Sequence, residues 1–185
     1  MPENIDYKFL SQLEGGSKIT GYVPAASVSK SGVTIATGFD LGQRNEADLK
    51  RLGLSIALTT KLKPYLGKKA KDAQALIKKS PLTITSVQAD EIDKSVKKKH
   101  IEQIKIKYNS VPGNKKKFAD LPSQAQTVIS SVSFQYGTGL STRAPKFWKA
   151  VTTQDWKESI KLLNNFGDVY PTRRKKEAKL LGEIK

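Results

Sequence analysis

The sequence predicts an α+β protein that is mostly helical, with a small β-hairpin lobe and a larger helical lobe. Two short β-prone segments, 19–23 and 33–37, lie on either side of the turn signal Lys30-Ser31-Gly32. Beyond them, apolar residues recur at helical spacing. The longest helical segment opens with the capping box Thr85-x-x-Gln88 and is expected to bridge the two lobes.

The other elements follow from local signals. A first helix over residues 4–13 is expected to end at Gly15-Gly16, because glycine readily stops a helix. In the second β-prone segment, Val33 and Ile35 should face one side of the sheet and their neighbours the other. Further helices are expected at 45–52, 55–65, 70–79, 122–134, 144–151, 153–165 and 171–182.

These elements are expected to form one domain over residues 1–185. The small lobe should span about residues 15–84, and the helical lobe should combine residues 1–14 with 85–185. A cleft between two such lobes is the usual place for a polymeric substrate. The chain is expected to act as a monomer.

A strong positive charge dominates the composition. The formal net charge is +16, and residues 61–117 hold sixteen lysines against five acids. Such a surface attracts polyanions, for example nucleic acid, anionic lipid or an acidic cell-wall polymer, although a merely solubilising face explains it equally well. The lysine-rich segment has only two aromatic residues and no clear helix-turn-helix pattern, which argues against nucleic acid as the partner.

The sequence gives no sign of a metal or a cofactor. It has no cysteine, and His100 is its only histidine, so neither a disulfide framework nor a usual zinc site is expected. No apolar run is long enough to cross a bilayer, and the first residues do not resemble a signal peptide. We therefore expect no membrane span, no metal and no cofactor.

Two carboxylates stand in settings that suit acid–base chemistry on a glycosidic bond. Such chemistry needs one carboxyl group that keeps its proton and a second that is ionised. Glu14 ends the first helix, where the helix dipole disfavours negative charge, and Asp40 follows a strand and a glycine. Thr34 precedes Asp40 on the strand, and its hydroxyl could hold a water molecule or the aspartate in place. Each residue can also be explained without catalysis: Glu14 and Asp40 as surface acids, and Thr34 as a β-branched residue that suits a strand.

The order of these motifs resembles the phage-type lysozymes, which are muramidases of the two-lobed lysozyme superfamily, and most of all the lysozyme domain of pesticin-type bacteriocins. The resemblance implies a two-lobed lysozyme-like fold and runs in family order through nearly the whole chain. The similar segments are Glu14-Gly15-Gly16, residues 32–43, the long helix that Thr85 opens, Phe134-Gln135-Tyr136-Gly137, Trp156 and Tyr170-Pro171-Thr172-Arg173.

The resemblance also implies a catalytic role for three residues. Glu14 would be the general acid, Thr34 a catalytic threonine and Asp40 the second carboxylate. Because no acid lies between Ser17 and Phe39, the order Glu, Thr, Asp matches the pesticin type and not the ordinary phage enzymes. The sequence leaves open whether the anomeric configuration is retained or inverted.

Three further residues would bind substrate or support the site. The resemblance places Gln135 in the cleft with Tyr136 beside it, and it implies that Arg173 approaches Glu14 from the last helix. Arg173 also fits a surface ion pair with Glu177, which would contribute little by itself. Aromatic residues such as Tyr136 pack a core more often than they stack on sugars.

The expected function is hydrolysis of the β-1,4 bond between N-acetylmuramic acid and N-acetylglucosamine in peptidoglycan, by an antibacterial toxin, effector or lysin domain. Such a domain would act in the periplasm or at the cell wall of a target bacterium, delivered by another module, a secretion system or phage lysis. An immunity protein would fit a toxin, although no residue requires one. The alternative is a non-enzymatic protein that binds polyanions or glycans without cutting them.

Overall fold

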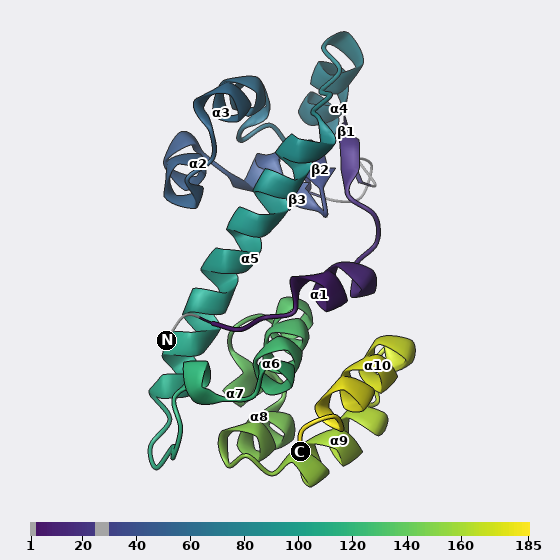
Figure 1. Cartoon of the computed structure of the whole chain (residues 1–185). Helices are drawn as coiled ribbons and strands as arrows, with labels where there is room; N and C mark the ends of the chain where they lie inside the picture. The colour runs from purple at the N-terminus through teal and green to yellow at the C-terminus, as the bar shows by residue number, and fades with distance from the viewer. Residues whose placement is uncertain (1–2, 25–29) are drawn as a thin grey trace. The chain divides into compact units, whose positions relative to one another are not determined.

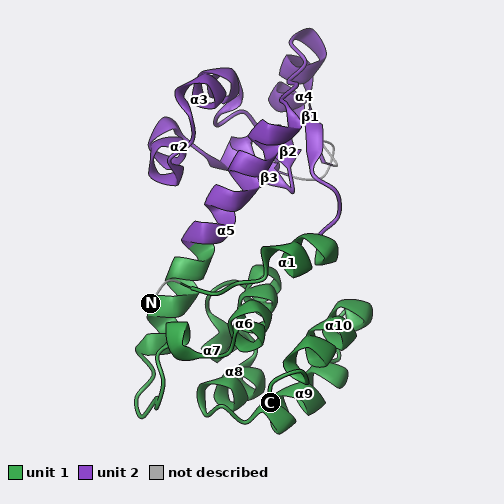
Figure 2. Cartoon of the chain, viewed as in Figure 1, with its two compact units in different colours: residues 1–13, 100–185 green, residues 14–99 purple. Residues whose placement is uncertain are grey.

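The computed structural model describes residues 3–24 and 30–185, and the chain divides into two compact units (Figure 1, Figure 2). Unit 1 combines residues 1–13 with 100–185, and unit 2 is the continuous segment 14–99. The 24-residue helix α5 (Ser86–Asn109) contributes to both units. A mostly helical chain with one small antiparallel sheet confirms the predicted α+β class.

Unit 2 is built on a three-stranded antiparallel sheet in the order β1-β2-β3. Strand β1 (Lys18–Tyr22) pairs with β2 (Thr34–Ala36), and β2 pairs with β3 (Phe39–Asp40). Val33 and Ile35 are fully buried, as their alternation predicted, but residues 34 and 36 are buried too. The central strand is therefore covered on both of its faces.

The helices of unit 2 supply the rest of its apolar core. Leu49, Leu58 and Leu62 are fully buried in one cluster with Val33 and Ile35. The predicted helices at 45–52, 55–65 and 70–79 are confirmed, although the second ends in a 3-10 turn that contains Pro64. The helical segments are η1 (Leu41–Gln43), α2 (Glu46–Leu52), α3 (Ile56–Leu62), η2 (Lys63–Tyr65) and α4 (Ala70–Lys79).

The start of α5 confirms the predicted capping box. The Gln88 N–H donates to the Thr85 hydroxyl oxygen, and the Thr85 N–H donates to the Gln88 side-chain oxygen, both at 3.1 Å. These two bonds satisfy N–H groups that have no partner inside the helix. Apolar residues at helical spacing along α5 are buried, including Ile92, Ile104 and Tyr108.

Unit 1 packs its helices around α6 (Ser123–Tyr136), in which the nine residues from Ala125 to Ser133 are buried. Pro145 and Pro171 occupy the first turns of α8 and α10, where a missing N–H costs little. The four-residue helix α7 was not predicted, because so short a segment shows no periodicity. The other helices are α1 (Tyr7–Leu13), η3 (Phe118–Asp120), α7 (Leu140–Arg143), α8 (Pro145–Thr152), α9 (Trp156–Asn164) and α10 (Pro171–Leu181).

The segment that contains α1 is fixed to α6. The Asn4 N–H donates to the Gln126 side-chain oxygen at 3.0 Å, and the Asp6 N–H donates to the Thr127 hydroxyl at 2.9 Å. Leu10, the buried residue of α1, is fully withdrawn from water. Across residues 3–24 and 30–185, no helix combines the length and the apolarity that crossing a membrane requires.

Candidate active site

Glu14 directly follows the last residue of α1, and its side chain is 16% exposed. Its Oε2 lies 2.7 Å from Lys97 Nζ in an ion pair, and the Lys97 side chain is itself only 12% exposed. Water screens an ion pair less when both side chains are shielded than when they are exposed. Sequence reasoning missed this partner, because Lys97 lies in a run of three lysines that the sequence alone does not distinguish from one another.

Asp93, one helical turn before Lys97, holds the neighbouring backbone. Its carboxylate accepts hydrogen bonds from the Ser17 hydroxyl at 2.9 Å, from the Thr37 N–H at 3.1 Å and from the Thr37 hydroxyl at 2.6 Å. Ser17 precedes β1 and Thr37 follows β2. Residues 14–17 are therefore attached to α5 at two points, through Lys97 and through Asp93.

Thr34 and Asp40 are opposite each other in the pairing of β2 with β3. Directly opposed residues of an antiparallel pair have Cβ atoms about 4.5–5.5 Å apart, so these two side chains share one face of the sheet. Thr34 is 3% exposed, and its hydroxyl donates to the Gly32 carbonyl oxygen at 3.2 Å. The structure thus brings together two of the three residues predicted to be catalytic.

Asp40 also organises the loop around it. Its Oδ1 accepts hydrogen bonds from the Gly32 N–H at 2.9 Å and from the Gly42 N–H at 2.8 Å, and so caps η1. The two glycines touch backbone to backbone: a Cβ on Gly32 would lie 2.4 Å from the Gly42 Cα. Oδ1 of Asp40 therefore holds the backbone of this loop in place.

Gln135 and Tyr136 end α6 in unit 1, and both are half-buried. The Tyr136 hydroxyl donates to the Asp168 carboxylate at 3.1 Å, and its ring packs edge-on against Phe166 at 5.4 Å. Burial, and then Asp168, raise the pKa of the Tyr136 hydroxyl above its ordinary value. Tyr136 thus packs within unit 1, as expected for most aromatic residues of this region.

Arg173 is not the surface residue of the alternative interpretation. Its side chain is 8% exposed, and its Nε donates to Glu177 Oε1 at 3.2 Å. Its other nitrogens donate to the Ser131 hydroxyl at 2.9 Å and to the carbonyl oxygens of Ser131 and Leu13, both at 3.2 Å. The spacing of Arg173 and Glu177 suggested an exposed pair, but α6 and α1 bury it. Arg173 binds the residue just before Glu14.

A comparison with known protein families identifies the family of the chain. The model of the Pesticin family, described as a bacterial toxin homologue of phage lysozyme (C-terminal), matches residues 4–157. The chain belongs to the Pesticin family. This membership confirms the predicted resemblance and the lysozyme-like fold. No curated protein matches the chain closely enough to be compared.

Membership of the Pesticin family implies a glycoside hydrolase of the lysozyme type and a toxin domain. The match includes Glu14, Thr34, Asp40, Gln135 and Tyr136, whereas Arg173 lies beyond it. The individual roles of these residues are not part of the match and stay predictions.

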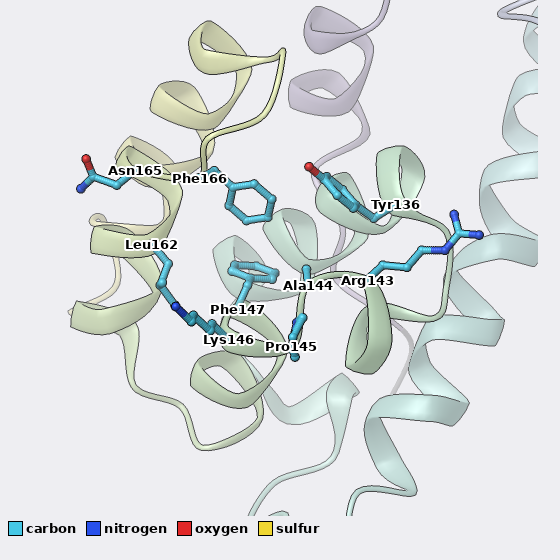
Figure 3. Close-up of a pocket in the computed structure, with 9 residues that line it drawn as sticks. All are labelled: Tyr136, Arg143, Ala144, Pro145, Lys146, Phe147, Leu162, Asn165 and Phe166. Carbon is cyan, nitrogen blue, oxygen red and sulfur yellow. The ribbon is translucent and has the colours of Figure 1, made fainter.

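A cavity of about 390 Å³ lies in unit 1 of this Pesticin-family chain (Figure 3). The rings of Phe147 and Phe166 face it, whereas the guanidinium of Arg143 and the amide of Asn165 point away. Its lining combines these aromatic rings with polar side chains. Its lining residues are Tyr136, Arg143, Ala144, Pro145, Lys146, Phe147, Leu162, Asn165 and Phe166.

Arg174, which the sequence did not single out, lies at the centre of a buried ion network in unit 1. Its side chain is 1% exposed and donates from Nη1 to Glu177 Oε2 at 2.5 Å and from Nε to Asp168 Oδ2 at 2.9 Å. The guanidinium carbon also lies 4.7 Å from the centre of the Phe166 ring. Glu177, which is fully buried, binds Arg173 and Arg174 together.

His100, the only histidine, is half-buried at the start of the unit 1 part of α5. Its Nε2 lies 3.0 Å from the Ser133 hydroxyl, which donates its own proton to the Ser130 carbonyl oxygen at 2.7 Å. Ser133 must therefore accept from His100, and the neutral ring carries its proton on Nε2. Burial lowers the pKa of His100 below its ordinary value and outweighs a hydrogen bond with Ser133 that raises it, and nearby Lys107 also lowers it.

This environment predicts a pH dependence of stability. Because the pKa of His100 is lower in the folded chain, the unfolded chain takes up the proton first as the pH falls, and stability present above about pH 6.5 is lost below it. A His100→Gln variant should show a smaller fall in melting temperature between about pH 7 and pH 5. Thermal unfolding at several pH values measures this, and equal slopes for both proteins would contradict the prediction.

Proposed function

We propose that the chain is a muramidase that hydrolyses the β-1,4 bond between N-acetylmuramic acid and N-acetylglucosamine in peptidoglycan. Membership of the Pesticin family carries this proposal, because the family is described as homologous to phage lysozyme. The net charge of +16 supports an anionic polymer as the substrate.

The proposed chemistry uses three residues of unit 2. Glu14 donates a proton to the glycosidic oxygen, and Asp40 acts as the ionised second carboxylate. Thr34, opposite Asp40 in the sheet, holds a water molecule or the aspartate in place. The shielded side chain of Glu14 and the cross-strand pairing of the other two support these roles.

We assign three residues of unit 1 to the binding and support of the substrate site. Gln135 and the neighbouring Tyr136 are proposed to contact the glycan. Arg173 has its nitrogens bound within the protein, so its proposed role is to hold the Leu13 carbonyl and thereby the backbone that leads to Glu14.

The proposed setting is an antibacterial toxin or effector domain that acts on the wall of a target bacterium. The description of the family as a bacterial toxin supports this setting. In such a setting another module or a secretion system would deliver the domain, and an immunity protein would protect the producing cell.

Mass spectrometry of digested peptidoglycan tests the bond assignment. Purified walls are incubated with the protein, and the soluble fragments are reduced and sequenced. Reducing ends on N-acetylmuramic acid support the proposal. Reducing ends on N-acetylglucosamine or cleaved peptides would assign another bond, and binding to the walls without soluble fragments would favour the non-enzymatic glycan binder.

Asp40 is proposed to act in catalysis and also accepts two backbone hydrogen bonds, so two substitutions of it should give different results. Asp40→Asn keeps an oxygen for the Gly32 and Gly42 N–H groups but removes the charge, so we expect the rate of wall lysis to fall about 100-fold or more with little change in melting temperature. Asp40→Ala also removes the acceptor and should lower stability by about 1–3 kcal/mol. Turbidity loss and thermal unfolding measure both. Full activity of Asp40→Asn would show that Asp40 only holds the loop in place and takes no part in the reaction.

A further inference from the structure

The ion pair between Lys97 and Glu14 differs from the other lysine and arginine pairs of unit 2. The cations of the Arg51–Asp48 and Lys63–Glu46 pairs are 61% and 55% exposed, so water screens them. Lys97 and Glu14 are 12% and 16% exposed and meet at 2.7 Å. A lysine withdrawn from water to this extent needs an oxygen beside it, because a polar group that loses water without a partner is costly.

On the C-terminal side of Glu14, the backbone has no side chain to hold it until Ser17. Gly15 and Gly16 follow it, and a Cβ at either position would meet nothing within 4 Å. Glycine also allows the chain more conformations than any other residue. The side chain of Glu14 therefore depends on contacts from α5 for a fixed position: Lys97 binds it directly, and Asp93 fixes Ser17 three residues further on.

The pair also distinguishes the two oxygens of the carboxyl group. Lys97 binds Oε2, and within residues 3–24 and 30–185 no hydrogen bond or ion pair is found at Oε1. Oε1 is thus the oxygen left to face a substrate. A catalytic group must be held close to its reactive geometry, because a displacement of about 1 Å can cost about 100-fold in rate.

We propose that Lys97 is a positioning residue for the glycosidase reaction, which binds Oε2 of Glu14 so that Oε1 is presented to the glycosidic oxygen. This inference rests on the proposed function of Glu14 as the general acid. In the step, Glu14 starts as the protonated acid, and its proton moves from Oε1 to the glycosidic oxygen while the bond from that oxygen to the anomeric carbon breaks. The anomeric carbon takes up the oxygen of a water molecule, which gives up a proton in turn. The leaving sugar departs as an alcohol, and the ammonium of Lys97 stabilises the carboxylate that remains on Glu14.

The test compares Lys97→Met, Lys97→Gln and Lys97→Arg with a matched control, Lys98→Met. Lys98 is the next residue of α5 and is exposed, so its removal changes the net charge equally without touching Glu14. Steady-state kinetics on soluble peptidoglycan fragments give kcat and KM for each variant, and thermal unfolding shows that each variant is folded.

We expect Lys97→Met and Lys97→Gln to lower kcat by about 10- to 100-fold with KM changed by less than about threefold. Lys97→Arg, which can still donate to Oε2, should recover most of kcat, and Lys98→Met should match the unsubstituted protein. The proposal is overturned if both neutral variants keep kcat within about twofold, if the loss appears in KM alone, or if the arginine variant loses as much as the neutral ones.

A Glu14→Gln variant in the same experiment distinguishes a failure of the Lys97 proposal from a failure of the proposed function. If it is inactive while the neutral Lys97 variants keep their kcat, Lys97 is only a structural partner and the proposed function stands. If it is as active as the unsubstituted protein, the assignment of Glu14 as the general acid is itself wrong.

Discussion

Glu14→Gln is expected to abolish the loss of turbidity of peptidoglycan suspensions, with a fall in rate of about 100- to 10,000-fold. Glutamine has the same shape and keeps an oxygen for Lys97, but its amide cannot deliver a proton to a glycosidic oxygen. Because the fold around residue 14 keeps its contacts, the melting temperature should change little. Turbidity assays and thermal unfolding of the purified variant measure the two effects.

Glu46→Gln is the matched control for this substitution. Glu46 is also a glutamate of unit 2 that pairs with a lysine, Lys63 at 3.0 Å, but its side chain is 53% exposed. The control should lyse walls normally, which would show that the loss of one negative charge is not the cause. Normal lysis by Glu14→Gln would instead show that Glu14 is not the general acid.

Glu177→Ala should give the largest loss of stability. It leaves Arg173 and Arg174, which are 8% and 1% exposed, without the carboxylate that they share. Removing one partner of a buried ion pair costs about 3–5 kcal/mol, because the remaining charge stays buried and uncompensated. For a chain of this length the melting temperature should fall by about 6–20 °C.

Differential scanning calorimetry measures this fall, and Glu183→Ala supplies the comparison. Glu183 is exposed near the end of the chain, so its loss should change stability by less than about 0.5 kcal/mol. Ser131→Ala, which removes only the hydroxyl that binds Arg173 and Glu177, should fall between the two. A Glu177→Ala variant as stable as Glu183→Ala would show that the network does not stabilise unit 1.

Helix boundaries and contacts differ in how far the sequence predicts them. The cap at Thr85 was predictable because its partner, Gln88, lies three residues away. The surroundings of Arg173 were not, because Ser131 and Leu13 lie 42 and 160 residues away in the chain. Spacing alone therefore suggested a surface pair where the structure has a buried one.

The residues of the candidate site also differ in how far the sequence predicts them. Glu14 and Asp40 stand out in the sequence because each lies beside glycines at the end of an element. Lys97 does not, because only the fold of unit 2 distinguishes it from the adjacent Lys98. The two hydrogen bonds that Asp40 accepts were likewise hidden, since they depend on the close backbone contact of the loop glycines.

The division of the chain sets an order of assembly during synthesis. All of unit 2 has left the ribosome soon after Lys99 is added, whereas Asn4 and Asp6, just before α1, bind Gln126 and Thr127, which are made later. A seven-residue helix is too short to persist alone, so α1 has no stable partner until α6 emerges. Unit 2 is therefore the first part able to fold, and unit 1 closes last, when its C-terminal helices arrive.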